Sequence, residues 1–389
     1  MKTYNVGGLQ LERPFRIRRI GHVGYHTPAV NDTARFLAEQ IGLLQSDFDD
    51  FTTRVPQLPK EHAYGYFFRC NTDHHTVVIG SQMLVDVREP KRKGALVGQL
   101  SWQVGSLKEV IDGIAFLDEE ATLRRVGRDA PGSNWHAYAY DPDGYINEVF
   151  YGMEQVGWDG RSKPVAMYDR AFHEAPSLPQ IPEYREVDIA KARGDEGGGY
   201  RCEQPPEPGF DVDGILMPRP FKVTRLGHVG LFVKDVSRSV EFYTRVMGLK
   251  VTRYLDVQGQ RCAFLRAGGE HHSLALYPEA LEEVCGFSAS YGLVVATYQQ
   301  LVDARRHLQA QGARLLDAPA ELSPGMPYGF WVQGPDRVGI YLHYGMEQVD
   351  RAGKSSEPPL LSPSSAHWPE QIEHGEAAWF DPPFLGPLA

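Results

Sequence analysis

The sequence predicts an α+β protein of two tandem domains, each made of two βαβββ modules. Three pairs of matching segments support this architecture, and each pair joins a segment of the first half to one of the second half. The pairs follow the same order in both halves, as a duplicated domain requires. They are residues 16–43 with 222–249, 67–80 with 264–277, and 141–156 with 334–349.

The matching segments divide the chain into two domains and two connecting parts. The first domain is predicted at residues 15–156 and the second at 221–349. Residues 157–220 are rich in Pro, Gly and charged side chains, and this composition is typical of an extended linker rather than of a third core. Residues 350–389 have the same character and are predicted to form an extended tail.

Each module begins with a short strand that is followed by an amphipathic helix. In the first copy the helix is expected to begin at Asn31 or Asp32 and to end at Gly42. In the second copy Asp235 and Gly248 hold the corresponding positions. Asn and Asp are favoured just before a helix, and Gly just after it. Three strands follow each helix, and the whole pattern occurs twice in each domain.

The composition is that of an ordinary globular protein. The chain of 389 residues has a formal net charge of −10, which argues against a general binder of nucleic acid or of anionic membranes. It contains no run of about 18 apolar residues and no signal-peptide pattern at its N-terminus. The four cysteines are scattered without a CxxC pair. We therefore expect a cytoplasmic protein with reduced thiols.

Two predicted strands of the first domain place polar side chains on one face, because these residues alternate with others along the strand. They are Gln99, Ser101 and Gln103 on one strand, and His136, Tyr138 and Tyr140 on the other. Burying unpaired polar groups is costly, so these faces are expected to line a wet cleft. Ser101, Gln103 and Tyr140 are the candidate substrate-binding residues.

This arrangement resembles the vicinal oxygen chelate superfamily, which contains glyoxalases, fosfomycin-resistance proteins and the type I extradiol ring-cleavage dioxygenases. The resemblance covers both predicted domains. It is carried by GHVGLFVKDVSRSVEFYTRVMGL (227–249), HHSLALY (271–277) and DPDGYINEVFYG (141–152). Two tandem domains of two modules each are also the architecture of the extradiol dioxygenases.

The resemblance implies a metal site in the first domain. In this family the ligands come from the first strand of a domain's first module and from the first and last strands of its second module. These positions carry His22, Gln99 and Glu148. Extradiol dioxygenases have His at the position of Gln99, whereas Gln is a ligand in relatives of glyoxalase I. A divalent metal is therefore implied, with Fe(II) first and Mn(II) or Zn(II) as alternatives.

The second domain is expected to have lost this site. Its corresponding positions are assigned to His228, Tyr291 and Tyr341, which provide no carboxylate. His228 is therefore expected to be a remnant of the duplication. If modules of different halves packed together, however, His228 could join Gln99 and Glu148.

The resemblance also suggests catalytic residues. His75 matches an active-site histidine that acts as acid or base in extradiol enzymes, and His74 is expected to point to the other face. Tyr138 matches a tyrosine that hydrogen-bonds the bound substrate oxygen. A further histidine of that family is replaced by Asp129, and His136 is expected to take its part.

Three functions remain open at this point. The first is an extradiol-type dioxygenase that cleaves a catechol-like aromatic ring with O₂. The second is a glyoxalase-like, metal-dependent isomerase, lyase or hydrolase, which Gln99 favours. The third is a metal-free protein that binds a small aromatic molecule. The expected partners are a small aromatic substrate, O₂ for the first function and further copies of the chain, but neither nucleic acid nor a membrane.

Overall fold

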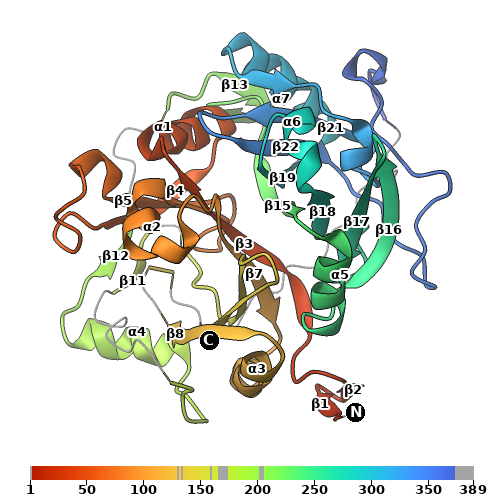
Figure 1. The fold of residues 1–389 in the computed structure, drawn as a ribbon. Helices are drawn as coiled ribbons and strands as arrows, with labels where there is room; N and C mark the ends of the chain where they lie inside the picture. The colour runs from red at the N-terminus through yellow and green to blue at the C-terminus, as the bar shows by residue number, and fades with distance from the viewer. Residues whose placement is uncertain are drawn as a thin grey trace.

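Two eight-stranded sheets, one from each half of the chain, dominate the computed structural model and confirm the predicted fold class. Figure 1 shows the first sheet and its helices in red to yellow, and the second in green to blue. Both sheets have the same strand order, so the two halves are copies of one domain. The structure describes residues 2–128, 131–132, 135–157, 160–164, 174–200 and 206–372.

The first sheet has the order β4-β5-β6-β3-β7-β10-β9-β8, and its two modules meet through the antiparallel pairing of β3 with β7. Its strands are β3 (Ile17–Thr27), β4 (Leu44–Asp50), β5 (Tyr64–Arg69), β6 (Val77–Ser81), β7 (Val97–Val104), β8 (Thr122–Arg128), β9 (Trp135–Tyr140) and β10 (Ile146–Tyr151). Because β10 also pairs with β7, the three strands predicted to carry metal ligands are neighbours at the centre of the sheet.

The second sheet repeats this order as β16-β17-β18-β15-β19-β22-β21-β20. Its strands are β15 (Val223–Val233), β16 (Lys250–Val257), β17 (Gln260–Arg266), β18 (Leu274–Pro278), β19 (Ala289–Val295), β20 (Arg314–Leu316), β21 (Tyr328–Gln333) and β22 (Val338–Tyr344). Here β15 pairs with β19 of its own half. The modules of different halves are therefore not exchanged, and His228 does not join Gln99 and Glu148.

The helices follow the predicted order, with one difference at the first N-terminus. Asp235 caps α5 as expected, because its side chain accepts a hydrogen bond from the backbone of Arg238 at 3.1 Å. In the first copy, however, α1 begins after Ala29 and lacks a side-chain cap. It continues as a π-helix (Phe36–Ile41) that ends at Gly42, where φ is +87°.

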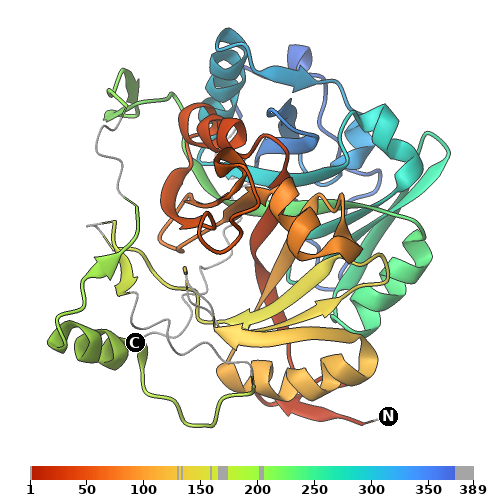
Figure 2. The ribbon, with the colours of Figure 1, turned by 60° about the vertical axis from the view of Figure 1, so that its left-hand side comes forward.

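The bounds of the helices are α1 (Val30–Arg35), α2 (Gln82–Arg88), α3 (Leu107–Glu120), α4 (Glu183–Ala192), α5 (Val236–Arg245), α6 (Glu282–Cys285) and α7 (Tyr298–Ala310). Figure 2 shows α3 lying along the yellow strands of the first sheet. In the part of the chain that the structure describes, no helix is long and apolar enough to cross a membrane.

A hairpin precedes each sheet and extends the duplication beyond the boundaries predicted at residues 15 and 221. The hairpins are β1 (Tyr4–Val6) with β2 (Leu9–Leu11), and β13 (Phe210–Val212) with β14 (Ile215–Met217). They occupy matching positions in the two copies. The match of Val6 with Val212 and of Leu9 with Ile215 could have revealed them.

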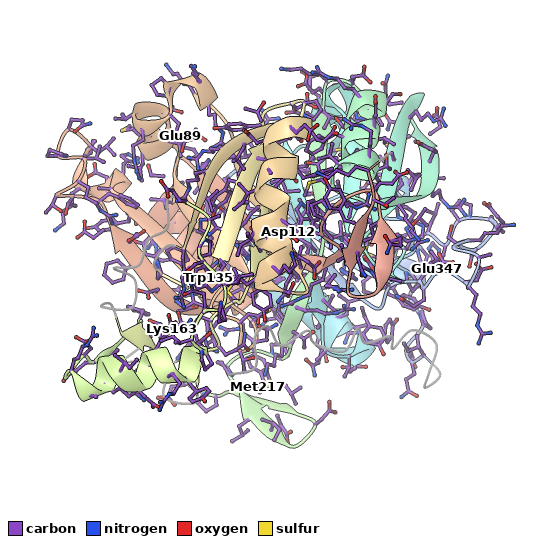
Figure 3. All side chains as sticks on the ribbon, turned by 90° about the horizontal axis from the view of Figure 1, so that it is seen from below. Glu89, Asp112, Trp135, Lys163, Met217 and Glu347 are labelled. Carbon is purple, nitrogen blue, oxygen red and sulfur yellow. The ribbon has the colours of Figure 1, made fainter. Side chains whose placement is uncertain are left out.

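The sequence had suggested an extended linker, but part of it forms a helix and two short strands. It holds α4 and the short strands β11 (Ser162–Pro164) and β12 (Gly197–Gly198). A two-point contact of Arg128 with Glu186, at 2.9 and 2.7 Å, joins α4 to the first domain. Lys163 and Glu183 form a second ion pair at 3.0 Å, and Figure 3 shows Lys163 beside this helix. These buried ion pairs fold the linker back onto the first domain.

Reciprocal contacts join the two domains. Thr33 Oγ1 donates to Asp336 Oδ2 at 3.2 Å, and Ser239 Oγ donates to Asp143 Oδ2 at 3.0 Å. Thr33 and Ser239 hold matching positions on α1 and α5, and the two aspartates hold matching positions before β22 and β10. The domains are thus related by an approximate twofold axis, like the subunits of a symmetric dimer.

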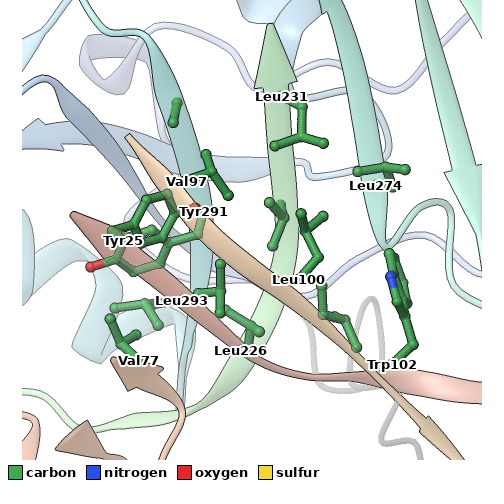
Figure 4. Packing of buried hydrophobic residues seen from close by; sticks show 14 of the residues in the cluster. Tyr25, Val77, Val97, Leu100, Trp102, Leu226, Leu231, Leu274, Tyr291 and Leu293 are labelled. Atoms are coloured by element: carbon green, nitrogen blue, oxygen red, sulfur yellow. The ribbon is translucent and has the colours of Figure 1, made fainter. Parts of the chain in front are cut away.

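One apolar cluster continues across this junction. Tyr25 of β3 and Tyr291 of β19 stack with ring centroids 5.2 Å apart, and the Tyr25 hydroxyl donates to the carbonyl of Ser290 at 2.9 Å. Figure 4 shows this pair among buried residues from both sheets. The domains therefore share a core instead of touching through a wet surface.

Candidate active site

A cavity of about 600 Å³ lies within the first domain. The polar strand faces that were predicted to line a cleft reach it through Gln99, His136 and Tyr138. Apolar, basic and imidazole side chains complete the wall. Those that matter below are His22, His26, Phe67, His75, Arg92, Arg124, Arg125 and Glu148.

His22, Gln99 and Glu148 meet at the floor of this cavity. The Nε2 atom of His22 lies 2.9 Å from Glu148 Oε2, and the Gln99 side-chain nitrogen lies 3.2 Å from each of these atoms. Strand register explains the meeting, because both His22 and Glu148 lie opposite Ser101 of β7. The three side chains predicted as metal ligands therefore converge on one point.

The spacing of these three atoms fits a divalent ion. Two ligands at right angles around an ion, each about 2.1 Å from it, lie about 3 Å apart. The ends of an amide are nearly isosteric, so a half-turn of the Gln99 amide presents its oxygen to the same point. The Oε1 atom of Glu148 is buried without a hydrogen-bond partner. Among the described residues no three His, Cys, Asp or Glu side chains form such a group, so an ion at this point would depend on the amide of Gln99 as well.

Glu148 is held as an anion. Burial alone would raise its pKa, but the neighbouring imidazole of His22, together with His136 and Ser101, lowers it to about 2. Ser101 is fully buried below the cavity and donates a hydrogen bond to Glu148 Oε2 at 2.5 Å. Ser101 therefore positions the carboxylate instead of lining the cavity as a substrate-binding residue.

His75 lines the cavity next to His22, with the two ring centroids 4.3 Å apart. Burial, with the neighbouring His22 and His74, lowers the pKa of His75 well below its ordinary value. His74 lies beside His75 but is not among the described residues that line the cavity. Both residues precede β6, so strand alternation does not apply to them, and their Nδ1 atoms lie 3.0 Å apart.

His136 and Tyr138 stand beside Glu148 on the opposite wall. The Nδ1 atom of His136 lies 3.4 Å from Glu148 Oε1, and the Tyr138 hydroxyl donates to Gln99 Oε1 at 3.4 Å. The guanidinium of Arg125 lies 4.6 Å from the centre of the Tyr138 ring. His136 thus contacts the carboxylate itself, which supports its assignment as an active-site residue.

Gln103 and Tyr140 are not brought to this site, although both were predicted to bind substrate. Gln103 is buried and accepts a hydrogen bond from Arg19 Nε at 2.6 Å. Neither residue is among the described residues that line the cavity. Asp129, which replaces a histidine of the extradiol pattern, lies outside the described residues.

Several cavity residues were not among the predicted site residues. Arg92 and Arg124 both pair with Glu89 at the rim, at 3.0 and 2.5 Å. The Nδ1–H group of His26 donates to the carbonyl oxygen of Ala95 at 3.0 Å, and burial lowers the pKa of His26 to about 4. The spacing of His26 after His22 on one strand could have revealed it, whereas nothing local distinguishes the arginines from surface residues.

The corresponding face of the second domain carries His228, Ser290 and Tyr341. The register of β15 and β19 places Ser290, and not Tyr291, where Gln99 lies in the first domain. The helices that follow begin after Ser106 and Thr297, which confirms a one-residue error in the assignment of Tyr291. Tyr291 instead faces the domain junction. The absence of a carboxylate from these three positions is unchanged by the correction.

Comparisons with known proteins agree with this fold. Residues 225–342 match the family model of the Glyoxalase/Bleomycin resistance protein/Dioxygenase superfamily. The Glyoxalase domain-containing protein RDO1 of Mycosarcoma maydis is 25% identical over 132 residues, which span 32% of this chain and 70% of that protein.

Two solved structures cover both domains. The 2,3-dioxygenase LapB from Pseudomonas sp. KL28 has a TM-score of 0.56 at 13% identity, over 87% of this chain and 95% of LapB. The Mn(II)-bound glyoxalase from Novosphingobium aromaticivorans has a TM-score of 0.53 at 14% identity, over 93% and 97% of the two chains. At this identity the likeness concerns the fold alone.

The fold is that of two tandem vicinal oxygen chelate domains, as in these solved structures. The family model matches the second domain, and the likeness of the first domain to these structures concerns its fold.

Proposed function

We propose that this chain is a metal-dependent, extradiol-type dioxygenase that cleaves a catechol-like dihydroxylated ring with O₂. The observation that carries the proposal is the triangle of His22, Gln99 and Glu148 at the floor of a cavity of about 600 Å³. Two-domain proteins of the same fold include structures described as catechol dioxygenases, which supports this chemistry.

The three side chains would hold the ion from one side, with Fe(II) as the first candidate. One imidazole, one amide and one carboxylate form a mixed nitrogen and oxygen set that also accepts Mn(II) or Zn(II). A bound divalent ion supplies Lewis acidity and open positions for two adjacent substrate oxygens and for O₂. Ser101 keeps the carboxylate oriented by its hydrogen bond to Glu148.

His75, Tyr138 and His136 would act on the substrate. His75 lies beside His22 and can accept a proton from a substrate hydroxyl at its ring nitrogen. Tyr138 carries its hydroxyl next to Gln99 and can donate a hydrogen bond to a substrate oxygen there. His136 contacts Glu148 on the same wall and can stabilise negative charge that develops on the substrate.

Gln99 supports a second candidate function. An amide oxygen is a harder ligand than imidazole, so this set also suits an ion that does not change its oxidation state. A glyoxalase-like isomerase, lyase or hydrolase would need only such an ion. A metal-free protein that binds aromatic molecules is the third candidate, because Gln99 and Ser101 already satisfy Glu148 Oε2 by hydrogen bonds.

Metal analysis of anaerobically purified protein tests these candidates together. We expect about one iron per chain, lost in Glu148→Ala, and unchanged in the matched second-domain variant Tyr341→Phe. Oxygen uptake with a panel of catechols would then be measured. Zinc or manganese without oxygen uptake would favour the isomerase, lyase or hydrolase, and absence of metal from the wild-type protein would leave the binding protein.

A further inference from the structure

A second cavity, of about 710 Å³, lies at the junction of the two domains and is lined by basic residues. Its walls are hairpin β1–β2, the start of β3, the end of the α5 segment, and the turn after β17. Figure 1 shows hairpin β1–β2 below α5 in this region. Its charged lining residues are Arg13, Arg16, Arg18, Arg19, Lys250 and Arg266, and none of the described lining residues is acidic.

Acidic partners neutralise only part of this charge. Arg19 pairs with Asp73 at 2.7 Å, and Arg18 approaches Glu109 only to 3.9 Å. Arg13, Arg16, Lys250 and Arg266 form no ion pair with any described residue. The cavity therefore concentrates positive charge in a chain whose formal net charge is −10.

Two of these arginines are held at the junction by glycines. A Cβ atom on Gly248, where φ is +81°, would lie 1.9 Å from Arg13 Nε, so this guanidinium rests directly on the backbone after α5. Arg266 Nη1 donates to the carbonyl of Gly268 at 2.6 Å, while its Nε atom is buried without a hydrogen-bond partner. Guanidinium groups fixed in this way are preorganised for an anion.

The approximate twofold axis provides an internal comparison. Arg13 and Arg16 have basic counterparts, Arg219 and Lys222, at the related position across the axis. Among the lining residues that differ there, four changes remove charge or add side chains. Arg18 corresponds to Thr224, Lys250 to Leu44, Gly268 to Asn71, and Gly269 to Thr72.

The two locations therefore differ in their side-chain contacts and in their charge. Asn71 Nδ2 donates to the carbonyl of Thr224 at 3.3 Å, which bridges the two domains at the related position. At the cavity, Gly268 and Gly269 offer no such side chain, and Arg18 and Lys250 add two positive charges. Arg19 and Arg266 also have basic counterparts, Arg225 and Arg69, so the duplication accounts for part of the charge, whereas Arg18, Lys250 and the two glycines are particular to this cavity.

We propose that this cavity binds a small organic polyanion, with its phosphate or carboxylate groups on the arginines and Lys250. The volume lies in the range of small-molecule sites, and Leu9, Leu11 and Ile17 provide an apolar wall for the carbon skeleton. Because Arg16 comes from the first domain and Lys250 from the second, the ligand bridges the domains and stabilises their packing. The cavity is separate from the candidate active site and shares no lining residue with it.

Isothermal titration of the full chain at low ionic strength tests this site. The probes are benzene-1,3,5-tricarboxylate for the carboxylate source and fructose 1,6-bisphosphate for the phosphate source, each against NaCl of equal ionic strength. Binding of either probe supports the site, and its preference identifies the source. We expect Kd to rise at least about tenfold in the double variant Arg16→Ala/Lys250→Ala, because two charge-assisted contacts are lost.

Lys222→Ala is the matched control, because Lys222 is the exposed counterpart of Arg16 across the axis. It removes the same kind of charge and should leave Kd within about twofold of the wild-type value. Equal loss in the control and the double variant, an unchanged Kd in the double variant, or no binding of either probe to the wild-type protein would overturn the proposal. Neither probe needs the metal or turnover, so the result is independent of the proposed enzymatic function.

Discussion

The two sheets have the same strand order, but the inner face of the first lines a cavity and that of the second is covered by packed aromatic side chains. In the first domain Gly80 and His26 lie side by side on β6 and β3 and line the cavity. In the second domain the paired residues are Tyr277 and Phe232, which are buried with ring centroids 5.3 Å apart. Gly80 thus leaves space in the first domain that Tyr277 occupies in the second.

Other residues at the corresponding place in the second domain are also bulky aromatic side chains. Trp331 stands where Tyr138 lies, and it packs between Phe287 and Tyr341 with centroid distances of 4.7 Å to each. Tyr341 replaces Glu148, so the second domain has a second apolar cluster at the place of the cavity. The candidate site therefore depends on a few side chains of one face. The strand order, which both domains share, depends on the rest of the sheet.

Tyr277→Ala should have the largest effect on this comparison. The side chain is fully buried, and its hydroxyl donates to the carbonyl of Leu322 at 2.8 Å. We expect the free energy of unfolding to fall by about 3–5 kcal/mol, as for other buried aromatic residues truncated to Ala. Urea denaturation measures it. Tyr254→Ala, at an exposed tyrosine of the same domain, should cost less than about 1 kcal/mol, and equal losses in both variants would contradict the filled interior.

His343 offers the next largest effect, through pH. It replaces Phe150 of the first domain, and burial lowers its pKa to about 4 despite the raising effect of its hydrogen bond to Gly345. The unfolded chain takes up this proton near pH 6.5, whereas the folded protein stays neutral until about pH 4. The unfolded state therefore binds more protons between these values, and stability falls as pH falls through this window.

His343→Phe should remove this contribution, which is of the order of 3 kcal/mol. We expect the loss of unfolding free energy between pH 7 and about pH 4 to shrink by about that amount, measured by denaturant melts at both pH values. The exposed His367→Ala is the control and should leave the pH dependence as it is in the wild-type protein. An undiminished acid sensitivity in His343→Phe would show that other groups dominate.

Much of this organisation could be predicted from the sequence. The repeats predicted two domains of two βαβββ modules each, and strand alternation together with the family resemblance identified His22, Gln99 and Glu148, which the structure brings within 3.2 Å of one another. The same alternation did not show which residues along the strand reach the cavity. Gln103 shares the face of Gln99, but it lies farther along β7, where its Oε1 atom accepts a hydrogen bond from Arg19. A periodicity assigns a face and cannot say how far a cavity extends along it.

The error at Tyr291 has a different physical cause. The strand was placed by matching apolar positions of the following helix, and an amphipathic helix tolerates a shift of one residue because its apolar stripe is broad. A strand does not tolerate it, because one residue reverses the face. Tyr291 therefore packs against Tyr25 at the domain junction, and Ser290 holds the interior position.

Gly80→Leu should have the smallest energetic effect and gives the sharpest test of the comparison. A Cβ atom at Gly80 would meet only His26 Cδ2, at 3.4 Å, so the side chain can enter the cavity without a clash with the backbone. We expect the free energy of unfolding to change by less than about 1 kcal/mol. The Kd of a chromophoric ligand, 4-nitrocatechol, should rise about tenfold, because the leucine occupies ligand volume as Tyr277 does in the second domain.

Gly209→Leu, at a glycine with open space around it, is the matched control and should leave Kd unchanged. If Gly80→Leu bound the ligand as the wild-type protein does, the open interior of the first domain would not be the binding site, and the contrast between Gly80 and Tyr277 would concern packing alone.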